Sequence, residues 1–264
     1  MHPFNYQNPK SVADAAAALA KGGDAKLLAG GQSLIAALKL RLAAPSDLID
    51  LSGIKELAGI KVEGNNISIG AMTRHAEVAR SKDVQAKIPA LARLAGGIGD
   101  RMVRNMGTIG GSLAHNDPVA DYPAAVLGLN ATVTTNKRKI AADDFFKGLF
   151  ETALAAGEII VSVSFPQPKR AAYIKFKNPA SRYAIVGVMA AETASGVRVA
   201  VTGAGSCVFR VAAMEKALAA KWSPDAIAGI SVPANELNSD LHASAEYRAH
   251  LITVMARRAV EAAK

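Results

Sequence analysis

The sequence predicts an α+β protein built from three consecutive units. Half of its 264 residues are hydrophobic and 20% are charged, a balance that predicts a packed core. Short strands and helices are mixed along the chain, and crossover helices do not separate the strands at regular intervals. This pattern favours an α+β class over a doubly wound parallel sheet.

The first unit, residues 1–54, contains helices and short strands in alternation. Its Ala-rich helix has Ser11 or Asp14 near the start, and a second helix follows Ser33 because apolar residues recur there at helical spacing. The expected elements are a helix over 13–20, strands over 26–28 and 48–51, and a helix from residue 34 that Pro45 ends.

The second unit, residues 55–168, opens on a hairpin whose strands flank Gly64-Asn65-Asn66. Thr73 is expected to cap the next helix. The remaining expected elements are helices over 88–94 and 121–128 and strands near 131–134 and 158–165. The third unit, residues 169–264, is expected to have an antiparallel meander over 172–177, 184–192 and 197–203, then helices near 211–220 and 243–262.

Composition restricts the class of protein. No apolar run approaches the roughly 18–20 residues of a membrane span, and the N-terminus has no secretory signal pattern. Cys207 is the only cysteine, which excludes a disulfide framework and predicts a cytoplasmic setting, either free or at the inner membrane face within a complex. The net charge is +9, but the basic residues are scattered and aromatic residues do not interleave with them, so nucleic-acid binding is not expected. The basic run 137–139 is interpreted as a hairpin tip.

Two glycine-rich loops carry the chemistry. The first, 29–33, is Ala-Gly-Gly-Gln-Ser between a strand and a helix. Its glycines allow close approach of a ligand to the backbone. The free N–H groups at the start of the helix that Ser33 is expected to cap suit a diphosphate. The second, 105–112, has three glycines around Thr108 and Ser112, and its successive N–H groups predict an anion-binding concavity. Each loop alone is also compatible with a plain connection, but the pair favours a diphosphate ligand.

Other candidate residues are less specific. The segment 203–208 begins like a dinucleotide fingerprint but has Val208 in place of the third glycine, so it is interpreted as a turn at a strand end. Asp121 is compatible with a ligand contact and with a helix cap. His115 and Asp117 lie near the second loop without enough further ligands for a metal, and no hydrolase or metalloprotease motif occurs. The sequence therefore predicts no catalytic residue and no metal site.

The segments 29–54 and 104–125 resemble the two FAD loops of the medium subunit of aerobic carbon monoxide dehydrogenase, a family that includes the flavin domain of xanthine dehydrogenase. The resemblance continues through 70–73, 157–166 and 245–251, and so covers nearly the whole chain. It implies a two-lobed FAD-binding fold of the vanillyl-alcohol-oxidase type plus a C-terminal domain, with boundaries near residues 54 and 168.

The resemblance also implies a set of cofactor-binding residues. Ile160 matches a position near the adenine, Lys177 a flavin-side lysine, and Tyr183 an aromatic residue that shields the flavin, although Tyr183 is equally compatible with a core residue. The full set is Ala29, Gly30, Gly31, Gln32, Ser33, Leu34, Thr108, Ile109, Gly110, Gly111, Ser112, Asp121, Ile160, Lys177 and Tyr183.

The family implies an oxidoreductase subunit that works in a complex. A molybdenum cofactor on a large subunit oxidises the substrate, [2Fe–2S] clusters on a small subunit pass on the electrons, and FAD here delivers them to an acceptor, in an expected dimer of heterotrimers. The extra iron–sulfur cluster of the benzoyl-CoA reductase branch is not expected, because it needs several cysteines. Two alternatives stay open: a stand-alone flavin oxidase of the vanillyl-alcohol type, and a basic, non-catalytic binding protein.

Overall fold

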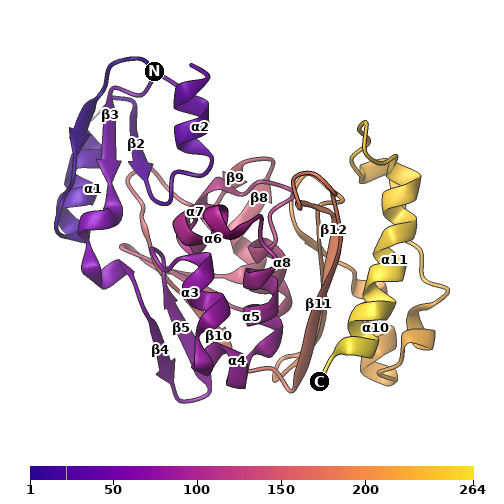
Figure 1. Cartoon of the computed structure of the whole chain (residues 1–264). Helices are drawn as coiled ribbons and strands as arrows, with labels where there is room; N and C mark the ends of the chain where they lie inside the picture. Colours follow the sequence, from indigo (N-terminus) through magenta and orange to yellow (C-terminus); the bar gives the residue numbers. More distant parts are fainter. Residues whose placement is uncertain (22) are drawn as a thin grey trace.

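The computed structural model describes residues 1–21 and 23–264 and confirms the α+β class. Three groups of elements lie side by side (Figure 1): a small N-terminal lobe, a larger second lobe and a C-terminal layer of sheet and helices. No helix among the described residues combines the length and the apolar character that crossing a membrane requires.

The first lobe is a three-stranded parallel sheet in the order β1-β3-β2, with one helix after β1 and another after β2. Its elements are β1 (Asn5–Gln7), α1 (Val12–Lys21), β2 (Ala25–Leu28), α2 (Leu34–Lys39) and β3 (Asp47–Asp50), followed by the 3₁₀ turns η1 (Leu51–Gly53) and η2 (Lys55–Leu57). Its apolar cluster contains Ile49 and Leu57 and also Ile159 of the second lobe. The two lobes therefore share a core where they meet.

The second lobe is a five-stranded antiparallel sheet in the order β4-β5-β10-β6-β7, covered by short helices. Its strands are β4 (Ile60–Glu63), β5 (Asn66–Gly70), β6 (Thr132–Thr135), β7 (Lys139–Ala141) and β10 (Ile160–Pro166), and a separate hairpin pairs β8 (Phe146–Gly148) with β9 (Glu151–Thr152). Its helices are α3 (His75–Arg80), α4 (Lys82–Lys87), α5 (Pro89–Gly96), α6 (Arg101–Met106), α7 (Ile109–His115), α8 (Tyr122–Gly128) and α9 (Ala142–Phe145). The predicted hairpins at 64–66 and 137–139 are confirmed.

The C-terminal domain is an antiparallel meander with a helical layer on one face. Its elements are β11 (Arg170–Lys177), β12 (Ala184–Thr193), β13 (Gly196–Thr202), β14 (Phe209–Arg210), α10 (Ala212–Ala220), the 3₁₀ turns η3 (Pro224–Ile227) and η4 (Ala234–Glu236), and α11 (Ala245–Ala262). Alternate residues of β12 face opposite sides, since Met189 joins the core of the second lobe and Val188 joins the cluster under α11. β12 is therefore buried on both faces, and the sheet is fixed against the second lobe (Figure 1).

Three local predictions were wrong. Helix α2 ends at Lys39, well before Pro45, because Arg41 adopts a left-handed φ of 59° and the N–H of Leu42 bonds to the carbonyl of Ala37. Thr73 does not cap α3: its hydroxyl bonds to the backbone of Gly59. Ser33 precedes α2, but its side chain makes no capping hydrogen bond.

Candidate cofactor site

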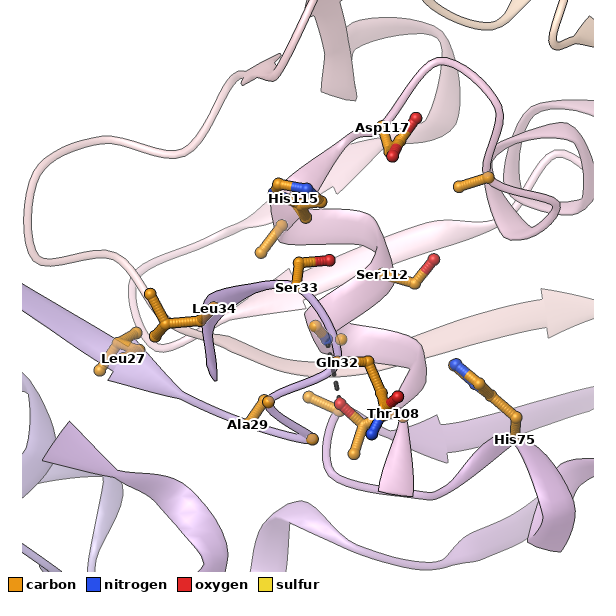
Figure 2. A pocket seen from close by; sticks show the side chains of 18 of the residues that line it. Leu27, Ala29, Gln32, Ser33, Leu34, His75, Thr108, Ser112, His115 and Asp117 are labelled. Carbon is orange, nitrogen blue, oxygen red and sulfur yellow. Dashed lines mark hydrogen bonds between the residues drawn. The ribbon is translucent and has the colours of Figure 1, made fainter. Parts of the chain in front are cut away.

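A cavity of about 740 Å³ opens where the two lobes meet. Both glycine-rich loops line it, and the hairpin turn between β11 and β12 contributes Ser181 and Tyr183. Small-molecule and cofactor sites have volumes of roughly 300–1,000 Å³, so this cavity can hold a ligand of that class. Figure 2 shows Gln32 and Ser33 of the first loop facing Thr108 and Ser112 of the second across this space.

The two loops are packed directly against each other. A Cβ atom on Gly30 would lie 2.7 Å from the Cα of Gly107 and against the carbonyl oxygen of Met106. A Cβ on Gly111 would lie 3.3 Å from the Cβ of Ala29. Glycine is therefore needed at residue 30 because any side chain there would separate the loops.

The first loop supplies free backbone donors. In residues 1–21 and 23–264, the N–H groups of Gly31, Gln32, Ser33 and Leu34 make no hydrogen bond to the protein. Gly31 has a φ of 72°, in the left-handed region that favours glycine. All four residues line the cavity; Gly31 and Leu34 are half-buried and Gln32 and Ser33 are exposed, so the four amides are accessible to a ligand. Four consecutive free donors are suited to the oxygens of an anion.

The second loop differs from the prediction, because the protein already uses its amides. Each N–H from residue 109 to 112 donates to a nearby oxygen: Ile109 to Thr73 O (3.1 Å), Gly110 to Ala71 O (2.8 Å), Gly111 to Thr108 Oγ1 (3.2 Å) and Ser112 to Thr108 O (3.0 Å). The first two bonds attach the start of α7 to the segment 71–73, and the other two close the turn on Thr108. The loop therefore has fewer free amides than predicted: among the described residues, its remaining donors to the cavity are the N–H of Thr108 and the hydroxyls of Thr108 and Ser112.

Asp121 lies in the cavity wall at the start of α8 and is 4% exposed. Its carboxylate accepts hydrogen bonds from Tyr173 Oη (2.5 Å) and from Lys175 Nζ (2.9 Å). Burial raises the pKa of Asp121, while the Lys175 ammonium and the Tyr173 hydroxyl oppose that shift. The carboxylate is therefore positioned by two side chains of β11 rather than acting as a simple helix cap.

Tyr173 and Lys175 were not among the predicted residues. Residues 173, 175 and 177 alternate along β11, so their side chains share one face of the strand, and this period could have drawn attention to them. None of the three lines the cavity itself; Tyr173 and Lys175 reach it through Asp121, whereas Lys177 is exposed at the end of the strand.

The other predicted cofactor-binding residues differ in whether they line the cavity. Ile160 lines it at the start of β10, and Tyr183 lines it while remaining 47% exposed. Partial burial, together with the charges of Asp117 and Asp121, raises the pKa of Tyr183. Ile109 does not line the cavity but is fully buried in the core beneath α7.

His75 is a cavity residue that the sequence did not single out. Its ring lies 5.3 Å from that of Tyr122, and the residue is 5% exposed. Burial, aided by the positive charge of Arg104, lowers its pKa from 6.5 to about 4. Among the described residues, Nδ1 of His75 is buried without a hydrogen-bond partner.

His115 and Asp117 also line the cavity, near the C-terminal end of α7 (Figure 2). The His115 ring packs on Phe150 at 4.9 Å. No group of three or more His, Cys, Asp or Glu side chains in the described part of the chain is arranged to hold a metal ion.

The cavity has the features that FAD requires. Free amides and hydroxyls gather where the loops meet, and apolar walls extend to either side of them. On one side Leu27, Leu51 and Ile159 belong to one apolar cluster. On the other side Ile98, Gly99 and Tyr183 lie together, since Arg182 bonds to the carbonyl of Gly99. Polar donors between two apolar ends match a diphosphate between two aromatic rings. The fold and this cavity together define a two-lobed protein that binds a dinucleotide-type cofactor.

Comparison with known proteins identifies the family. The family described as "FAD binding domain in molybdopterin dehydrogenase" matches residues 2–168, and the "CO dehydrogenase flavoprotein C-terminal domain" matches residues 171–263. The chain belongs to the FAD-binding medium subunits of the molybdenum hydroxylase family, and its cofactor is FAD. The predicted resemblance and the two-lobed FAD-binding fold are thereby confirmed.

Individual relatives cover almost the whole chain. The carbon monoxide dehydrogenase medium chain of Hydrogenophaga pseudoflava is 38% identical, covering 98% of this chain and 96% of the relative. The nicotine 6-hydroxylase medium subunit of Paenarthrobacter nicotinovorans is 37% identical, with 97% and 96% covered. A structure of reconstituted CO dehydrogenase from Oligotropha carboxidovorans superimposes with a TM-score of 0.90 at 35% identity, covering 98% of this chain and 96% of that chain.

Proposed function

We propose that this protein is the electron-transferring FAD subunit of a molybdenum-containing dehydrogenase complex. Electrons would arrive from [2Fe–2S] clusters of one partner subunit, after substrate oxidation at a molybdenum cofactor on another, and leave for an external acceptor. Relatives over the full length of the chain are named as medium subunits or chains of dehydrogenases and hydroxylases, which supports this role. The dimer of heterotrimers stays a prediction.

One observation carries the proposal: the strip of free amides at residues 31–34 beside the tight junction of the two loops. Such an arrangement suits a diphosphate, and among the described residues no lining serine or threonine hydroxyl is hydrogen-bonded to a histidine, as a nucleophile paired with a base would be. When bound, FAD supplies the redox chemistry, and the protein contributes binding, orientation and electrostatics.

Different residues of this chain would bind different parts of FAD. We propose that the amides of 31–34 and the hydroxyls of Ser112 and Thr108 bind the diphosphate, and that Gly30 sets the spacing of the loops. Asp121, held by Tyr173 and Lys175, would accept hydrogen bonds from cofactor hydroxyls. Ile160 would lie near the adenine and Tyr183 beside the flavin.

For the flavin-side lysine, Lys175 fits better than Lys177. Its side chain is only 10% exposed and its ammonium lies 2.9 Å from the Asp121 carboxylate in the cavity wall. In the described part of the chain Lys177 makes no salt bridge, and it is exposed.

A charge placed in the amide strip tests the proposal. Gly31→Asp puts a carboxylate beside the diphosphate site, and Gly31 already has a φ of 72° that a larger residue adopts with strain. We expect the purified variant to lose the yellow flavin absorbance. Gly229→Asp is the matched control, because no heavy atom lies within 4 Å of its Cβ position. If Gly31→Asp kept a full complement of FAD while folded, the first loop would not be the diphosphate site.

A stand-alone oxidase would act differently from an electron-transfer subunit. Turnover of an organic substrate by the purified FAD-loaded chain, without molybdenum or iron–sulfur subunits, would contradict the proposed function.

A further inference from the structure

His75 is a buried titratable group for which the proposed function has no role. It begins α3 and lines the cavity, and among the described residues its Nδ1 is buried without a hydrogen-bond partner, while its Nε2 makes no hydrogen bond to the protein and packs against Gly107. Figure 2 shows its imidazole turned toward Gln32. A polar side chain that is only 5% exposed and unpartnered is costly unless a ligand completes it.

The imidazole lies at the junction of the two loops. A Cβ on Gly107 would be 2.5 Å from Nε2 of His75. Gly107 has an ordinary φ of −61°, so glycine is required there for space and not for backbone conformation. Gly107 also adjoins Gly30, which directly precedes the free amides of 31–34. Nε2 therefore lies next to the proposed diphosphate site.

Positive charge is scarce around that site. In the described chain the lining residues include one lysine, Lys26, and no arginine. Lys26 is itself paired with Asp24 on the surface, at 3.5 Å. A diphosphate carries two negative charges, and amides and hydroxyls supply only partial compensation. An imidazole beside it can supply a full positive charge.

On the basis of the proposed FAD function, we propose that His75 is a phosphate-binding residue whose Nε2–H donates to the diphosphate and whose ring takes a proton from solvent as the diphosphate binds. In the flavin-free protein the pKa of His75 is about 4, so the ring is neutral at pH 7. An anion within about 4–6 Å raises such a pKa by about 1–3. FAD affinity therefore rises as the pH falls through the pKa of the bound state, and levels off below about pH 4.

No charged group around His75 raises its pKa in the flavin-free protein, so the proposed rise must come from the bound diphosphate. Arg104 on α6 is the one charge that shifts its pKa, and it lowers it. Tyr122 on α8 contacts the ring, and burial raises the pKa of that hydroxyl so that it stays neutral. The other charged side chains on the helices packed around His75 are not among the causes of its pKa shift: Glu77, Arg80, Lys82, Asp83, Lys87, Arg93 and Arg101.

The test is a titration of the flavin-free, full-length chain with FAD from about pH 5 to 8, followed by fluorescence quenching. His75→Leu removes the donor and should weaken binding about 3- to 10-fold at pH 8, with a larger loss at lower pH. His75→Gln keeps a neutral donor near the Nε2 position, so it should stay within about threefold of wild type at pH 8 but lack the increase in affinity at low pH. His250→Gln, an exposed histidine on α11, is the control and should keep the wild-type pH dependence.

Two further measurements isolate the phosphate contact. Calorimetric titration in buffers of different ionisation enthalpy should show proton uptake by wild type at about pH 6 and none by His75→Gln. ADP-ribose, which carries the same internal diphosphate without the flavin and has no terminal phosphate that titrates in this range, should show the same pH dependence as FAD. Wild-type binding without proton uptake, or a pH dependence confined to FAD and missing with ADP-ribose, would overturn the proposal. A wild-type chain that bound no FAD would instead refute the proposed function itself.

Discussion

Gly30→Ala tests whether the contact between the two loops sets FAD affinity. The added Cβ would lie 2.7 Å from the Cα of Gly107 and closer still to the carbonyl oxygen of Met106, whereas ordinary Cβ contacts are 3.4–4 Å. Both neighbours are backbone atoms, so no flexible side chain can yield. The loops must therefore separate by about 0.7 Å or more, and overpacking of this kind costs about 1–3 kcal/mol.

This free-energy cost is expected to weaken FAD binding, because the two loops that separate are the ones that hold the cofactor. Hydrogen-bond donors must lie within about 2.7–3.2 Å of their acceptors, so a shift of this size weakens the bonds from the first loop while Thr108 and Ser112 stay in place. A loss of about 1–3 kcal/mol corresponds to about 5- to 150-fold weaker binding of FAD. We expect the variant to fold and to bind FAD with an affinity reduced by a factor in this range.

The assay is fluorescence titration with FAD, with urea unfolding of the flavin-free protein to measure stability separately. Gly229→Ala is the control, since its Cβ would meet no heavy atom within 4 Å. If Gly30→Ala bound FAD within twofold of wild type and unfolded at the same urea concentration, the inference that close loop contact shapes the site would be refuted.

Two further predictions concern ion pairs that connect parts of the fold. Arg138, together with the N–H of Ala155 and the hydroxyl of Thr135, lowers the pKa of Glu158 from 4.5 to about 2. The Glu158 carboxylate therefore stabilises the protein above pH 4.5, and this contribution is lost as the pH falls toward 2. Arg138→Met should move the midpoint of acid unfolding to higher pH, and an unchanged midpoint would contradict this. Arg198 is 7% exposed and joins β13 to the second lobe through Leu127 O (2.7 Å) and Asp143 (2.5 Å), so Arg198→Met should lower the free energy of unfolding by about 1–3 kcal/mol. The exposed pair Lys169–Glu192 is its control, and Lys169→Met should change stability by less than about 1 kcal/mol; equal losses in both variants would show that burial is not the cause.

The local elements could be predicted because their signals are local. The turn at 64–66, the apolar alternation over 184–192 and the glycine pair at 96–97 each depend on residues within a few positions of one another. Strand β1 was not predicted, because its three exposed residues have no pattern of their own and pair only through β3. Helix α2 ends early because Arg41 adopts a left-handed conformation, which its residue type does not announce.

The sequence by itself determined the α+β class, the family and the two loops that meet at the cofactor cavity, since glycine-rich turns are recognisable from composition and order. Only the tertiary structure decided how the two loops differ: among the described residues the amides of 31–34 are free, whereas those of 109–112 donate to the segment 71–73 and to Thr108. It alone placed Tyr173 and Lys175 on Asp121, across 52 and 54 residues of chain, and buried Nδ1 of His75 without a partner in the described part of the chain. The physical reason is that turn and helix signals act between near neighbours, whereas burial and hydrogen-bond partners depend on segments that approach only when the chain has folded.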